Sequence, residues 1–137
     1  MADAVTRAGG FVGMDPVTPA EFSAIAELEI PDAPSYLLVD FDPGSEFFDV
    51  TPDDALPRIL AGGRSPLTVD EGVAVLTHFP QVLVEENAFS LLGSRRGDRR
   101  VPALWLSRGR PRLGWCWAGA PHSWLGSATC AERVAEG

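Results

Sequence analysis

Residues 87–126 read NAFSLLGSRRGDRRVPALWLSRGRPRLGWCWAGAPHSWLG, and this stretch decides the fold. Three short β-like runs, at 88–94, 101–107 and 113–118, alternate with two connectors that carry glycine beside polar residues. Short connectors of this kind join antiparallel neighbours, so the pattern predicts a three-stranded antiparallel meander. The stretch also holds all four tryptophans and seven of the eleven arginines, which makes it the first place to look for a site.

The middle run has apolar side chains on both faces of the expected strand. Val101, Ala103 and Trp105 would share one face, and Leu104 and Leu106 would share the other, because side chains alternate along a strand. A strand that is apolar on both faces is covered on both faces. The middle run is therefore expected to be a central strand of the sheet.

The last run alternates between large and small side chains. Trp115 and Trp117 would point to one face, while Gly114, Cys116 and Ala118 would point to the other. Small residues leave room for something to approach, so we expect either a helix or a ligand against that second face.

Helix signals lie on both sides of the meander. Thr68 and Glu71 have the spacing of a capping box and predict a helix over 68–79, ending at Pro80. A second helix is expected at about 54–61, because Pro57 fits only near a helix start and Gly62-Gly63 would end it. Residues 123–134 are expected to form a closing helix.

The first third of the chain gives weaker signals. Residues 1–17 are small and aperiodic and predict a frayed start, while Thr18, Pro19 and Glu21 indicate a helix that ends before Pro31. Residues 36–41 predict a strand, and 47–50 its hairpin partner.

These elements predict an α+β fold, a small, mostly antiparallel sheet with two to four helices packed on it. The length of 137 residues fits one domain. We expect residues 36–137 to form that single domain and residues 1–35 to be an N-terminal extension with one short helix.

Charge is divided unevenly along the chain. The net charge is −8, but residues 95–112 carry +6 and the rest carries −14, and lysine is absent. A nucleic-acid partner is therefore not expected, because phosphate binding depends on basic residues spread over the contact surface. The sequence shows no apolar stretch that predicts a membrane span or a signal peptide, so cytoplasmic residence is expected.

Arginines and tryptophans together suggest a binding face. Guanidinium forks bind carboxylates and phosphates and also stack on aromatic rings. We expect the chain to bind, or to act as a small enzyme on, an anionic or aromatic small molecule there. The candidate ligand-binding residues are Arg95, Arg96, Asp98, Arg99, Arg100, Trp105, Trp115, Trp117 and Trp124. The alternative explanation is that the tryptophans form the core and the arginines pair with acids elsewhere.

Two other classes of function stay open. Exposed tryptophans would suit a protein interaction module or a homodimer interface. Cys116 as a nucleophile with His122 as its base would suit an enzyme. A zinc site from Cys116, His122, Cys130 and His78 lacks the usual close ligand pairs, so we assign no metal site, and the sequence does not identify a cofactor.

Three segments resemble a known family. The residue pairs L-T at 67–68 and E-G at 71–72, the run 94–105 and above all the run 114–126 are similar to an actinobacterial family of uncharacterised proteins, a domain of unknown function. The likeness covers about residues 36–126 and leaves out Cys130 and the expected N-terminal helix. It implies a bacterial cytoplasmic source and brings no activity, cofactor or catalytic residue with it.

Overall fold

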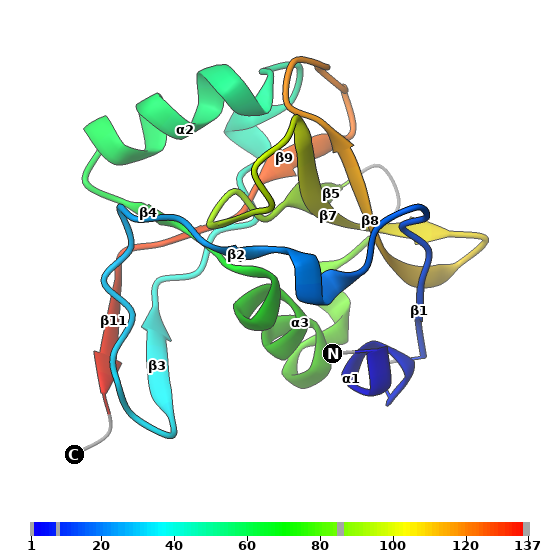
Figure 1. The fold of residues 1–137 in the computed structure, drawn as a ribbon, viewed down its shortest axis with the longest axis horizontal. Helices are drawn as coiled ribbons and strands as arrows, with labels where there is room; N and C mark the ends of the chain where they lie inside the picture. The colour runs from blue at the N-terminus through cyan, green and yellow to red at the C-terminus, as the bar shows by residue number, and fades with distance from the viewer. Residues whose placement is uncertain (1, 8, 85–86, 136–137) are drawn as a thin grey trace.

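A five-stranded sheet forms the centre of the molecule. The computed structural model describes residues 2–7, 9–84 and 87–135, and orders the sheet β1-β8-β7-β5-β9 (Figure 1). The strands are β1 (Phe11–Val12), β5 (Ala88–Ser90), β7 (Arg100–Ser107), β8 (Arg110–Trp117) and β9 (Leu125–Ser127). β5, β7 and β8 pair antiparallel, as the meander predicts, while β1 and β9 add to the two sides in parallel.

A two-residue turn sets the register of the central hairpin. Arg108 and Gly109, between β7 and β8, have φ angles of 54° and 77°. Positive φ at both positions gives the turn whose twist matches that of paired strands. The resulting register places Arg100 opposite Trp117 and Val101 opposite Cys116, so these two pairs lie on opposite faces of the sheet.

The two helices expected beside the meander are confirmed. α2 (Pro52–Ala61) begins after Thr51, whose hydroxyl accepts a hydrogen bond from the Asp54 amide at 3.1 Å. α3 (Val69–His78) begins with the predicted capping box of Thr68 and Glu71. Both start where a polar side chain satisfies an otherwise unpaired amide.

The start of the chain is ordered, contrary to the expectation of a frayed end. α1 (Ala2–Arg7) contacts α3, and its Val5 is completely buried. Met14, Val17 and Phe22 join Val5 in the main hydrophobic cluster. A six-residue helix is too short to show a helical periodicity in the sequence.

The helix expected from residue 18 to residue 30 is wrong beyond its first turn. The Thr18–Glu21 capping box forms, but it caps only the 3₁₀ turn η1 (Pro19–Glu21). The chain then extends into β2 (Ser23–Ala24), which pairs with β6 (Ser94–Arg95). The reason is that pairing with β6 and the Ile25 amide's bond to the Gly93 carbonyl satisfy the backbone without a helix.

The expected closing helix over 123–134 is also wrong. That segment forms β9, β10 (Thr129–Cys130) and β11 (Glu132–Ala135). Residues 125–130 are buried without interruption, whereas an amphipathic helix exposes one face. β10 pairs with β4 (Ser65–Pro66), and β11 pairs with β3 (Tyr36–Val39).

β3 therefore takes β11 as its partner, and the hairpin expected between 36–41 and 47–50 is wrong. The segment after β3 instead forms the 3₁₀ turn η2 (Ser45–Phe47), which lies against β9. Gly44 allows this approach, because its φ is 80° and a Cβ there would collide with the Ser127 carbonyl. The close backbone approach makes Gly44 a position that other residues cannot occupy.

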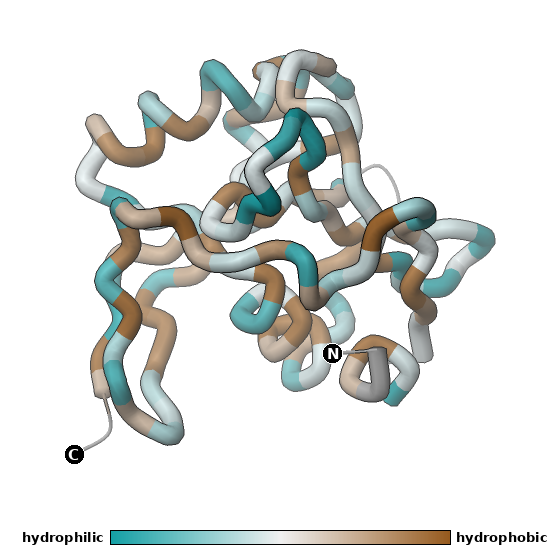
Figure 2. The backbone as a smooth tube through the Cα atoms, in the orientation of Figure 1, coloured by the Kyte–Doolittle hydropathy of each residue, from teal (hydrophilic) through white to brown (hydrophobic). Residues whose placement is uncertain are grey.

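Two hydrophobic clusters lie on the sheet. The larger one includes Leu76 of α3, Phe89 of β5 and Leu104 of β7, and the smaller one lies under α2 around Ala55 and Ile59. Figure 2 shows hydrophilic and hydrophobic residues alternating along α2, as expected for a helix with one buried face. The described chain is thus a mixed helix-and-sheet protein that is rich in strand, with a 3₁₀ turn η3 (Pro80–Val82) after α3.

No helix in the described ranges is long and apolar enough to cross a membrane.

Candidate functional site

Asp98 gathers the predicted arginines at the turn before β7. Its Oδ2 accepts hydrogen bonds from Arg96 and, at 2.7 Å, from Arg100, and its Oδ1 accepts the Arg100 amide at 2.9 Å. Arg95 donates to the Asp98 carbonyl at 3.1 Å. The Arg100 amide, and then the Arg100 and Arg96 guanidinium groups, hold the pKa of Asp98 below its usual range. The four residues form one cluster, the Asp98 cluster, in which an acid already occupies the centre.

The remaining charge of this turn pairs with distant acids. Arg96 also binds Glu21 at 2.9 Å, and Arg99 binds Asp53 at 2.6 Å. Bonds from the Thr18 amide and from Arg96 lower the pKa of Glu21. The arginines thus neutralise acids of η1 and α2, as the alternative explanation of the charge pattern expects.

Two tryptophans lie beside the Asp98 cluster on the same face of the sheet. The Arg100 guanidinium lies over Trp115 at 4.8 Å and over Trp117 at 5.4 Å, measured to the ring centroids. Trp115 donates its Nε1 hydrogen to the Asp15 carbonyl at 3.1 Å, whereas Trp117 is 49 % exposed. Arg100, Trp115 and Trp117 form a stacked surface with cation–π geometry.

The other two tryptophans lie on the opposite face. Trp105 packs edge-on against Trp124 at 6.3 Å, and Arg112 lies over Trp105 while donating to the Gly13 carbonyl. A Cβ at Gly114 would collide with the Trp105 ring. Trp105 and α2 therefore cover the small-residue face of β8, and the four predicted tryptophans divide between two faces of the sheet.

In the described part of the chain, Cys116 and His122 contact different residues and are not hydrogen-bonded to each other. Cys116 packs into the cluster beneath α2, and burial raises the pKa of its thiol to about 12. The His122 ring packs 5.0 Å from Trp124, and within the described chain no hydrogen bond joins it to Cys116. A thiol with this pKa is protonated at neutral pH and is a poor nucleophile.

The four residues considered for zinc also lie apart. Cys130 is completely buried on β10, and His78 ends α3 with its ring near Phe79. Over the described ranges, no three His, Cys, Asp or Glu side chains are grouped closely enough to hold a metal ion.

The sequence gives little sign of a buried ion pair between Glu71 and Arg133. Arg133 Nε and Nη2 donate to the two Glu71 oxygens at 2.6 and 2.8 Å, and both side chains are less than 5 % exposed. Tyr36 and the Thr68 amide also donate to Glu71, at 2.7 and 3.0 Å. Arg133 further donates to Ser65 and to the Pro66 carbonyl. We call this set the Glu71 network; its one sequence signal is that Arg133 is the only arginine after Arg112.

Burial and hydrogen bonding act on Glu71 in opposite directions. Burial raises its pKa, but the bonds from Arg133, the Thr68 amide and Tyr36 outweigh burial and leave the pKa below its usual value. Burial and then the Glu71 carboxylate raise the pKa of Tyr36, which stays a neutral donor. The network ties β3, α3 and β11 together.

A cavity of about 530 Å³ opens beside this network, between β3 and α3. Its polar lining residues are Tyr36, His78 and Gln81. Its larger apolar lining residues are Leu37, Leu38, Phe41, Val75, Phe79 and Val82. Sequence reasoning missed this cavity, because β3 and α3 are separate elements whose relative placement depends on β11.

The chain belongs to a family of unknown function (DUF5701), whose model matches residues 2–136. The match takes in the N-terminal residues and Cys130, both of which lie outside residues 36–126, the part that carries the resemblance. No curated protein and no solved structure is similar enough to count as a match.

Proposed function

We propose that the chain binds a small, uncharged aromatic or other apolar molecule in the cavity between β3 and α3. The cavity itself carries the proposal: its volume of about 530 Å³ lies within the range of about 300–1,000 Å³ usual for small-molecule sites. Its wall is mostly apolar, which is also usual for such sites.

The rim of the cavity exposes large apolar side chains. Leu37 is 55 % exposed and Phe79 is 56 % exposed. Covering such surface stabilises a complex by about 25 cal/mol for each Å² removed from water. A ligand with a flat or ring-shaped apolar body would cover both side chains while it fills the hollow.

The polar groups of the cavity set the charge of the ligand. The Tyr36 hydroxyl is engaged with Glu71, which leaves His78 and Gln81 to bind a polar substituent. Both lie at or just after the C-terminus of α3, where unpaired helix carbonyls carry partial negative charge. That charge disfavours an anion, and the mostly apolar wall disfavours burial of any full charge, so we expect a neutral ligand that can donate a hydrogen bond.

Titration with the neutral fluorescent probe N-phenylnaphthylamine tests the proposal. We expect a saturable rise in probe fluorescence and a rise in thermal midpoint, since a ligand at 100 times its Kd adds about 2.7 kcal/mol of stability. Absence of saturable binding would overturn the proposal.

A filled cavity gives the matched control. Ala74→Phe places a ring at the cavity wall and should abolish probe binding, whereas Ala61→Phe, at an exposed position of α2, should leave binding unchanged. Equal binding by the two variants would place the probe elsewhere on the protein and count against this site.

The Asp98 cluster supports a second candidate, the binding of an aromatic anion on the Arg100, Trp115 and Trp117 surface. In the described chain the Nε atoms of Arg95, Arg96 and Arg100 are buried and have no hydrogen-bond partner. Buried donors are normally paired, so an acceptor supplied by a ligand would complete them. Benzoate should quench tryptophan fluorescence in the wild type and not in Trp117→Leu; equal quenching in both would exclude this face.

The interaction-module and Cys/His-enzyme hypotheses have less support. Trp117 is the one tryptophan of the four that is exposed rather than half-buried. Rapid reaction of Cys116 with a thiol reagent in the folded protein, together with loss of a measured activity in Cys116→Ser, would support the enzyme hypothesis.

We also propose an α+β class, a cytoplasmic location, an actinobacterial source and a possible homodimer. The supports are the antiparallel pairing of β5, β7 and β8, which follow α2 and α3 in the chain, the missing lysines, and the exposed Trp117.

A further inference from the structure

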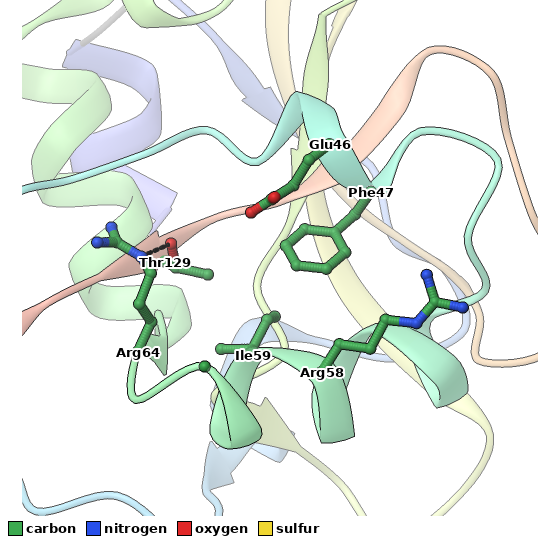
Figure 3. A pocket seen from close by; sticks show the side chains of 7 residues that line it. Glu46, Phe47, Arg58, Ile59, Arg64 and Thr129 are labelled. Carbon is green, nitrogen blue, oxygen red and sulfur yellow. Dashed lines mark hydrogen bonds between the residues drawn. The ribbon is translucent and has the colours of Figure 1, made fainter.

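A second cavity, of about 270 Å³, lies between η2, α2 and β10 (Figure 3). We infer that it binds a small dipolar molecule, with an ammonium group at one end and a carboxylate at the other end of a short apolar chain. This cavity is distinct from the one between β3 and α3, so the two sites can be tested separately.

The floor of the cavity is apolar and packed against the core. Phe47 of η2 and Ile59 of α2 are 6 % and 2 % exposed and belong to the cluster beneath α2. Both also line the cavity, so one surface of each meets the hollow while the rest is packed. The apolar chain of a ligand would cover this floor.

Opposite charges stand on the two sides of that floor. In Figure 3 the Glu46 carboxylate lies to the left of the Phe47 ring, and the Arg58 guanidinium lies to the right. Within the described chain neither side chain has a hydrogen-bond or ion-pair partner, and the two are not paired with each other. Each is free to bind a ligand group of the opposite sign.

The second arginine of the cavity is already neutralised. Arg64 binds Asp40 through Nη1 at 2.8 Å, and its Nε donates to the Thr129 hydroxyl at 2.9 Å. Arg64 therefore closes the wall beside Glu46 without offering a free charge. One free carboxylate and one free guanidinium, held apart over an apolar floor, match a dipolar ligand better than they match an ion of either sign.

Calorimetric titration with a series of amino acids of increasing length tests the inference. Glycine, γ-aminobutyrate and ε-aminocaproate carry the same two charges at growing separation. We expect a longer member to bind at least about tenfold more tightly than glycine, and at least about tenfold more tightly than caproate or hexylamine, which lack one charge. Equal affinity across the series, or no heat of binding from any member, would overturn the inference.

Substitutions at Glu46 and Arg58 test which side chain binds the ammonium end of the ligand and which binds its carboxylate end. Glu46→Gln should reduce ε-aminocaproate binding to the level of caproate, and Arg58→Met should reduce it to the level of hexylamine. The double charge exchange Glu46→Arg with Arg58→Glu should restore binding, since the ligand can reverse. Glu132→Gln and Arg7→Met remove exposed charges outside the cavity and should change nothing. Losses as large in these controls would show general charge screening and contradict the site.

Discussion

Glu71 and Asp98 each bind arginine, one in the interior and one at the surface. Glu71 accepts a bidentate pair of hydrogen bonds from Arg133, and both side chains are almost fully buried. Asp98 takes bonds from several arginines in a turn that stays partly open to water. Water screens the second set more than the first, so removing one partner is expected to cost more at Glu71, where a buried charge is left unpaired, than at Asp98.

The largest effect is expected from breaking the buried pair. Glu71→Gln leaves Arg133 buried without a counter-charge, and we expect unfolding free energy to fall by about 3–5 kcal/mol. Urea unfolding followed by circular dichroism measures the loss. Glu71→Gln with Arg133→Met should lose less than Glu71→Gln alone, because no buried charge is left; a larger loss in the double variant would contradict the explanation.

Low pH should weaken the Glu71–Arg133 ion pair. The pKa of Glu71 is lower in the folded than in the unfolded protein, so the unfolded state takes up a proton first as pH falls. The stability from Glu71 is present above about pH 4.3 and is lost as pH falls through its folded value. Urea midpoints between neutral and acidic pH should fall less steeply in Glu71→Gln than in wild type, and Asp98→Asn should flatten the curve less.

Substitution in the Asp98 cluster should change tryptophan fluorescence more than it changes the stability of the protein. Asp98→Asn removes the charge that holds Arg100 over Trp115 and Trp117, so we expect a shift in tryptophan emission. The urea midpoint should drop by only a small fraction of the Glu71→Gln change. A drop in urea midpoint as large as that of Glu71→Gln would contradict the expectation that the surface cluster matters less for stability than the buried ion pair.

The smallest effect is expected at the exposed Arg99–Asp53 pair. Its side chains are 62 % and 41 % exposed, and pairs of this kind contribute between zero and about 1 kcal/mol. Arg99→Gln should therefore unfold within about 0.5 kcal/mol of wild type, with any difference disappearing in high salt. A salt-resistant loss would show that this pair is shielded from water.

Local signals predicted local structure. The Thr68–Glu71 capping box marks the start of α3, and the glycine-containing connectors predict the β5, β7, β8 meander. Each of these features depends on residues a few positions apart. The sequence alone was sufficient there, because short-range geometry decides the outcome.

Segments whose partners are distant were predicted badly. The run 123–134 has helical composition, yet β11 forms because β3 offers an edge and Glu71 offers a counter-charge for Arg133. The run 22–30 extends for a similar reason, beside β6. Propensity is a weak prior where tertiary partners compete with it.

The same division applies to the candidate sites. The Asp98 cluster is visible in the sequence because its members are neighbours at 95–100. The cavity between β3 and α3, and the one between η2 and α2, combine segments that the sequence does not connect. The cluster of positive charge in the sequence indicated a binding site at the arginines of residues 95–100, but in the structure these arginines already bind protein acceptors.

The pairing of β3 with β11 also has a consequence for the speed of folding. Tyr36 pairs with Ala135, and Phe11 pairs with Arg112, so the early strands β3 and β1 both wait for partners made much later in synthesis. Chains dominated by such distant pairings fold in about milliseconds to seconds rather than microseconds. During synthesis β3 stays without its partner until β11 has left the ribosome, which exposes an apolar strand edge for the whole of that time.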